Sequence, residues 1–153
     1  MKYLFEYLRL TFISLEFLYV LLVVAVVQYF PSLLAELGST IRSDTDVLKW
    51  IPVLPLAMCG IVFRLAWRLT APLSGSNRLL YDWSEYWRLK CRRDFSVVLS
   101  AIVAIAAVSL WIFSGKLSNS VFGTVFTLAI GIGLIDMACL AFAGFKIKEL
   151  VEQ

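Results

Sequence analysis

The chain has 153 residues, of which 61% are hydrophobic, and its formal net charge is +3. Only about half of the residues of soluble domains are apolar. This composition and a mean hydropathy of +0.85 therefore exclude a soluble domain with most of its surface in water. Histidine, the commonest general base, is absent and the three cysteines have no paired spacing, so we expect no enzyme and no catalytic, metal or cofactor site.

Four apolar stretches are long enough to cross a membrane as helices. They cover residues 10–30, 47–69, 95–114 and 121–145. A helix rises ~1.5 Å per residue and needs ~20 apolar residues to cross a ~30 Å hydrocarbon layer. Backbone groups in lipid must be satisfied internally, and these stretches lack the alternation of barrel strands. The sequence therefore predicts an all-α integral membrane protein, a single domain over residues 1–153 that forms a four-transmembrane-helix bundle.

A short connection is expected between the first two spans. Pro31 stops the first helix, and the leucines that follow it are expected on the bilayer surface until Gly38 ends the turn. Either Asp44 or Asp46 then caps the second transmembrane helix, because a carboxylate can accept hydrogen bonds from the first backbone N–H groups of a helix.

Residues 70–94 form the most informative segment outside the spans. Pro72 and residues 74–77 are helix breakers, and a helical pattern follows them, which predicts a helical hairpin that continues into the third span. We predict that its aromatic and basic residues dock a partner: Trp83, Tyr86, Trp87, Arg88, Arg92 and Arg93. The same residue types are typical of membrane interfaces and of contact with anionic headgroups. Acidic residues interrupt the basic stretch, so we expect no direct contact with nucleic acid.

Basic residues indicate how the chain is oriented, since Lys and Arg near helix ends are retained on the cytoplasmic side. With the N-terminus inside, all of the 14 Lys and Arg residues except Arg42, Lys49 and Lys116 lie on that side. We therefore expect a multi-pass protein of the bacterial inner (plasma) membrane, with both termini and the hairpin in the cytoplasm.

Three charged residues fall within the predicted spans, namely Glu16, Arg64 and Asp136. A charge that faces lipid costs a few kcal/mol at least, so each is expected to face the bundle interior or a wet cavity. The simplest interpretation is a buried ion pair between Arg64 and one of the two carboxylates, which would fix the helix register. Two alternatives are a snorkelling Arg64 beside protonated carboxylates, and a path for protons or ions.

The fourth span repeats small residues at helical spacing. Gly123, Thr127 and Gly131 share one face, and Gly133 lies beside them. Such a pattern lets two helix backbones approach closely. The partner helix belongs either to the same chain or to another subunit, and we favour a homo-oligomer because so small a bundle needs neighbours to cover this face.

These observations favour a small oligomeric inner-membrane scaffold or sensor that recruits a cytosolic protein through its cytoplasmic loop. In layout the chain resembles the small four-span membrane subunits of bacterial phage-defence systems, such as that of Kiwa. The resemblance covers size and topology without any matched motif, and it implies a role in sensing infection and holding an effector. Two alternatives are a homo-oligomeric ion channel, pore or membrane effector, and an immunity protein that pairs with a membrane-active toxin.

Overall fold

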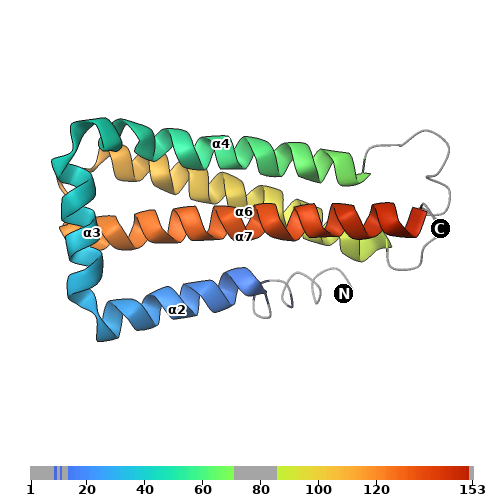
Figure 1. The fold of residues 1–153 in the computed structure, drawn as a ribbon, viewed down its shortest axis with the longest axis horizontal. Coiled ribbons are helices and arrows are strands. Elements are labelled where there is room, and N and C mark those ends of the chain that lie inside the picture. Colours follow the sequence, from blue (N-terminus) through green and yellow to red (C-terminus); the bar gives the residue numbers. More distant parts are fainter. Residues whose placement is uncertain (1–8, 10, 12–13, 71–85, 152–153) are drawn as a thin grey trace.

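The computed structural model describes Arg9, Thr11 and residues 14–70 and 86–151. Within these residues the chain is helical and contains no strand; the helices are α2 (Leu15–Tyr29), α3 (Pro31–Ser43), α4 (Thr45–Thr70), α6 (Tyr86–Ile112) and α7 (Asn119–Val151). Helices α4, α6 and α7 lie side by side, α3 runs across one end of them, and α2 returns along α7 (Figure 1). The end crossed by α3 is called the α3 end.

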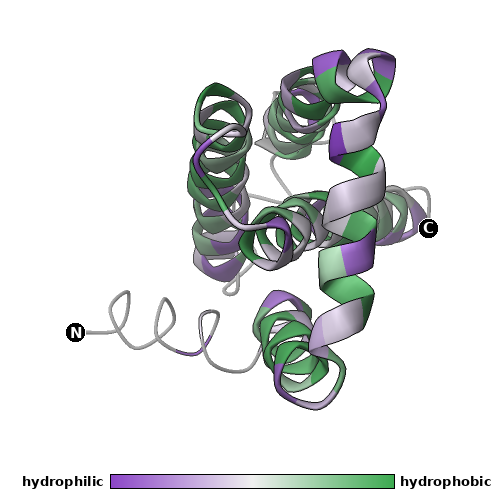
Figure 2. Ribbon diagram, turned by 90° about the vertical axis from the view of Figure 1, so that its left-hand side faces the viewer, coloured by the Kyte–Doolittle hydropathy of each residue, from purple (hydrophilic) through white to green (hydrophobic). Residues whose placement is uncertain are grey.

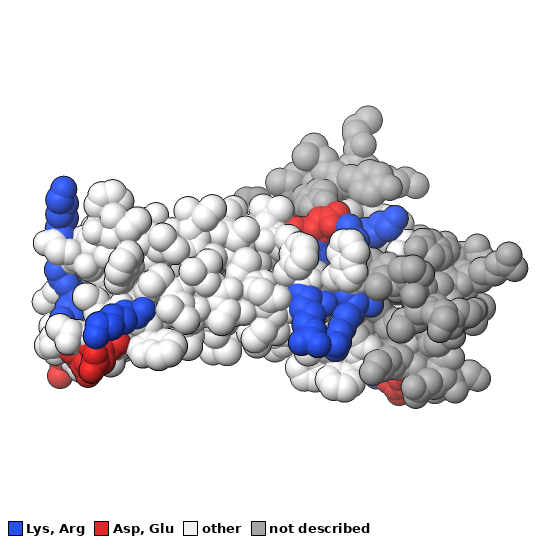
Figure 3. Space-filling model, turned by 90° about the horizontal axis from the view of Figure 1, so that it is seen from above, with Lys and Arg blue, Asp and Glu red and all other residues white. Residues whose placement is uncertain are grey.

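Three of these helices are long and apolar enough to cross a membrane: Thr45–Leu69, Tyr86–Ile112 and Asn119–Ile147. A fourth span is counted if α2 and α3, which are bent by 99° at their junction, are taken as one. Viewed from the α3 end, the helices that run away from the viewer show much green, the colour of apolar residues (Figure 2). On the surface, charged side chains gather near the two ends with an uncharged belt between them (Figure 3). The predicted all-helical class is therefore confirmed for the described residues, with three or four segments long and apolar enough to span a membrane.

The first predicted span differs from the observed structure. Helix α2 has 15 residues and measures about 22 Å, which is shorter than a ~30 Å hydrocarbon layer. The chain then turns at Phe30 into a second helix, so the connection that the sequence predicted to be short is occupied by the 13-residue helix α3. Pro31 occupies the first turn of α3, where its missing N–H costs no helical hydrogen bond and its fixed φ favours a helix start.

The sequence indicated that Gly38 ends the turn, but α3 continues through Gly38 to Ser43. Gly38 instead allows α3 to cross α7 at backbone contact. A Cβ atom added at Gly38 would lie 2.0 Å from the carbonyl oxygen of Asn119. One added at Gly123 would lie 2.1 Å from the carbonyl oxygen of Leu34. The two glycines therefore face each other where the helices cross, and each is required for the approach of the other helix.

Side-chain contacts close the α3 end. Arg42 Nη1 donates hydrogen bonds to the carbonyl oxygen of Leu117 at 2.9 Å and to Asn119 Oδ1 at 2.6 Å. Arg42 Nη2 donates to the carbonyl oxygen of Ser114. Asp44 caps α4, as predicted, because its Oδ1 accepts hydrogen bonds from the backbone N–H of Asp46 at 2.9 Å and of residue 47 at 3.3 Å. Helix α3 is thus fixed to the connection between α6 and α7.

The interior between the long helices is filled mostly by small and branched side chains. One buried cluster contains Val103, Ala107, Ala129 and Ile132, and a second contains Ile51, Leu110 and Phe122. In contrast, many large apolar side chains point outward, among them Trp67 and Phe142, which are 68% and 71% exposed. An apolar surface of this kind is stable in lipid, which explains the high hydropathy of so small a bundle.

Candidate functional site

The polar centre of the molecule joins α2, α6 and α7. Glu16 lies in the first turn of α2, which Ser14 caps by accepting a hydrogen bond from the backbone N–H of Phe17 at 3.2 Å. Asp136 lies midway along α7. Both side chains are buried, with 3% of Glu16 and 0% of Asp136 exposed. The structure therefore confirms that both carboxyl groups face the bundle interior.

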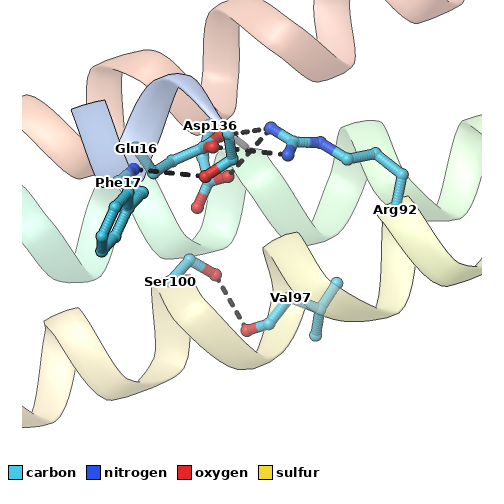
Figure 4. A network of polar contacts seen from close by, with 7 residues as sticks. Glu16, Phe17, Arg92, Val97, Ser100 and Asp136 are labelled. Atoms are coloured by element: carbon cyan, nitrogen blue, oxygen red, sulfur yellow. Dashed lines mark hydrogen bonds and ion pairs between the residues drawn. The ribbon is translucent and has the colours of Figure 1, made fainter. Parts of the chain in front are cut away.

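The cation beside these carboxyl groups is Arg92 of α6. Its Nη2 binds Glu16 Oε1, and its Nη1 donates to Glu16 Oε2 at 3.3 Å. The same Nη2 lies 3.9 Å from Asp136 Oδ1. Figure 4 shows the guanidinium group extended toward both acids, and its two nitrogens meet both oxygens of Glu16. Two-pronged contacts of this kind are the strongest arginine–carboxylate pairs. Glu16, Arg92 and Asp136 are called the ion cluster.

The predicted partner of the carboxyl groups was Arg64, and this prediction is wrong. Arg64 is exposed on α4, whereas the Arg92 side chain is only 20% exposed. The apolar stretch that defines the third span begins at Phe95, so Arg92 was assigned to the cytoplasmic docking surface. Because α6 is one continuous helix from Tyr86, Arg92 lies on its buried face, and its long side chain reaches along the bundle to Glu16.

One signal in the sequence could have identified Arg92. Ser96 and Ser100 are buried on α6, and with Val103 and Ala107 they continue one stripe at spacings of three and four residues. Extending this stripe by four residues toward the N-terminus reaches Arg92. Polar residues at 96 and 100 inside an apolar helix therefore marked the face that meets the two acids.

Three buried polar atoms in and beside the ion cluster have no hydrogen-bond partner within the described part of the chain. They are Ser96 Oγ and both carboxyl oxygens of Asp136. Buried polar groups are nearly always paired, and an unpaired one is costly at membrane depth. The cluster also holds two acids for one guanidinium group. Asp136 is therefore the least satisfied member, while Glu16 and Arg92 form the structural link.

The other residues predicted for docking lie at the first turns of α6. Tyr86 and Trp87 are half-buried and Arg88 is exposed, while Trp83 lies outside the described residues. Arg93 forms an ion pair with Asp94 at 2.6 Å. The guanidinium carbon of Arg88 lies 5.5 Å from the Trp87 ring centroid. The described residues of this set, from Tyr86 to Arg93, thus share one short stretch of α6 with Arg92, and their role in docking stays a prediction.

Helices of the same chain cover the small-residue face of α7. Gly123 meets α3, and a Cβ added at Gly131 would lie 2.1 Å from Cζ of the Tyr19 ring on α2. The hydroxyl group of Tyr19 donates a hydrogen bond to the carbonyl oxygen of Thr127 at 2.9 Å. Gly133 faces Met58 of α4. The partner helices that the sequence left open are therefore α2, α3 and α4.

An apolar groove of about 490 Å³ remains beside this contact, between α2, α3 and α7. Tyr19 and Leu37 border it on one side, and residues 126 to 135 of α7 border it on the other. Helix α2 thus meets the bundle through Glu16, Tyr19 and Val23, while most of its other side chains are exposed.

Comparisons with protein-family models, with curated proteins and with solved structures find no match to this chain.

Proposed function

We propose that this protein is a small inner-membrane scaffold or sensor that recruits a soluble cytosolic partner through residues 70–94. In this proposal both termini and that segment lie in the cytoplasm, as the distribution of Lys and Arg indicates. One observation supports it most directly. Helix α6 is continuous from Tyr86 to Ile112, and Arg92 near its start binds Glu16 of α2. The docking segment is therefore physically connected to α2 and α3, which together are called the α2–α3 arm.

The connection gives the proposed sensor its mechanism. Of the residues of α2, only Glu16 and Val23 are buried, so its position depends strongly on few contacts. A disturbance of the bilayer that displaces α2 pulls on Arg92 through Glu16. Arg92 lies one to two turns from Tyr86 and Trp87 on the same helix, so the displacement reaches the docking residues through a rigid element.

The chemistry of the docking stretch fits a protein partner. Tyr86, Trp87 and Arg88 belong to the residue types that dominate the energy of protein interfaces. The cations lie over the aromatic rings, with Lys90 Nζ 5.0 Å from the Tyr86 ring centroid, so the surface combines flat apolar area with positive charge. A partner with an acidic and apolar patch would match it.

Affinity capture of the tagged protein in mild detergent tests this proposal. The variant Trp87→Ala with Arg88→Ala is compared with Trp50→Ala, because Trp50 is 64% exposed at the other end of the bundle. We expect a soluble protein in stoichiometric amount with the wild type and with Trp50→Ala, and its loss with the double variant. Capture that is equal in all three samples would contradict the proposed docking surface.

The captured sample also shows how many copies of the chain associate, which tests the homo-oligomer that we propose. Phe63 and Trp67 are stacked on the outer face of α4, with ring centroids 6.4 Å apart and 57% and 68% exposure. Such a face suits a neighbouring subunit in lipid.

A role in phage defence rests on the resemblance in layout, and survival of infected cells with and without the gene tests it. Equal survival would contradict that role.

A further inference from the structure

We propose that Asp136 is an intramembrane proton-binding site, and that it holds its proton while Arg92 is bound to Glu16. In the ion cluster, one guanidinium group serves two buried carboxyl groups, whether or not a partner docks. Two acids that share one site seldom ionise together, because the second negative charge lacks compensation.

Geometry decides which of the two acids carries the proton. Both oxygens of Glu16 receive an N–H group of Arg92, the longer of these contacts measuring 3.3 Å, as an ionised carboxylate requires. Asp136 lies 3.9 Å from the nearer guanidinium nitrogen, beyond hydrogen-bond distance. Its two oxygens accept no hydrogen bond from the described residues, although the side chain is fully buried. A neutral carboxylic acid tolerates such surroundings far better than a carboxylate does.

A proton fits this position better than a metal cation. A cation needs several oxygen ligands, and the described residues contain no group of three or more Asp, Glu or Cys that could hold one. The guanidinium group of Arg92 would also repel a second cation placed against Asp136 Oδ1. A protonated Asp136 instead donates one hydrogen bond, and Ser96 Oγ on the facing helix is a buried oxygen that has no hydrogen-bond partner among the described residues.

The groups that face Asp136 come from each neighbouring helix. Helix α2 contributes Glu16, α6 contributes Arg92 and Ser96, and α7 itself contributes the thiol of Cys139 one turn away. On α4, Cys59 lies 3.7 Å from the hydroxyl group of Ser100, while the arginines of that helix, Arg64 and Arg68, are exposed. Arg92 is therefore the cation for which Glu16 and Asp136 compete.

Because of this competition, the proton on Asp136 affects how α2 is attached to the bundle. If Asp136 releases its proton to water at the partly exposed Arg92 end, the new carboxylate attracts the guanidinium group away from Glu16. Glu16 then loses its buried cation, and α2 loses one of its few attachments. The protonation of Asp136 thus determines whether the α2–α3 arm is held at its Glu16 end.

Infrared spectroscopy tests the assignment in purified protein. A buried carboxylic acid shows a C=O stretching band that a carboxylate lacks, so we expect this band in wild type at neutral pH and its loss in Asp136→Asn. The control Glu36→Gln removes an exposed acid of α3 and should leave the band unchanged. In Glu16→Gln, Arg92 has Asp136 as its remaining acidic partner, so Asp136 should ionise and the band should disappear.

The wild type alone supplies a test that needs no substitution. We expect the band to be lost as the pH is raised, and to be insensitive to sodium chloride at constant pH. Absence of the band at neutral pH, or its persistence in Glu16→Gln, would overturn the proposal. Loss of the band on addition of sodium at constant pH would assign the position to a cation and would equally overturn it.

Discussion

The crossing of α3 over α7 makes Gly123 a position where one added methyl group has a large effect. In Gly123→Ala the new Cβ would lie 2.1 Å from the carbonyl oxygen of Leu34, whereas ordinary contact begins at 3.4 Å. The neighbouring atom is backbone and cannot rotate away, so the two helices must separate by about 1.3 Å, the difference between these distances. Overpacking of a tight contact costs about 1–3 kcal/mol. A cost of about 2 kcal/mol corresponds to a roughly 30-fold larger unfolding constant.

Unfolding in mixed micelles with an increasing fraction of denaturing detergent, followed by circular dichroism, measures this cost. Gly60→Ala is the matched control, because a Cβ at Gly60 meets nothing within 4 Å and Gly60 also lies inside a helix. The control should be neutral or more stable by up to about 1 kcal/mol, as helix propensity favours alanine. If the two variants unfold at the same detergent fraction, the glycine crossing does not hold α3 in place and the reasoning fails.

Two further substitutions probe the two ends of the α2–α3 arm. Arg92→Met leaves two buried carboxyl groups without their cation and should lower the free energy of unfolding by about 3 kcal/mol, reduced to the extent that protonation neutralises the acids. Arg64→Met, on the exposed face, should stay within about 0.5 kcal/mol, and equal losses in both variants would contradict the assignment. Arg42→Ala removes three charge-assisted hydrogen bonds and should speed amide hydrogen exchange at residues 113–119, relative to Lys49→Ala. Unchanged exchange there would show that Arg42 does not hold the α6–α7 connection.

The sequence was sufficient for the elements that depend on local composition. The spans predicted at 47–69, 95–114 and 121–145 correspond to α4, α6 and α7, because a long apolar run in lipid can satisfy its backbone only as a helix. The cap at Asp44 was also predictable from a single residue type at a helix start. The docking hairpin predicted for residues 70–94 involves mainly residues 71–85, which lie outside the described part of the chain.

Features that depend on distant residues could not be predicted in this way. Glycine often ends helices, so Gly38 was expected to do so. Only the presence of Gly123 across the contact makes Gly38 a helix-crossing residue. Arg92 lies outside the apolar run, and its burial depends on acids contributed by α2 and α7. In both cases the local signal was ambiguous, and the tertiary contact determined the outcome.

The two helices on either side of the bend, α2 and α3, are attached to the bundle with unequal strength. Helix α3 is fixed by backbone contact with α7 and by Arg42, so α2 is a lever whose pivot lies near Phe30. Glu16 is at the far tip of this lever, about 21 Å away at ~1.5 Å per residue. A tilt of about 10° moves that tip by about 4 Å over this length, which is enough to part a carboxylate from a guanidinium group. Under the proposed sensor function, this lever would amplify a small change in bilayer thickness at the point where Glu16 meets Arg92.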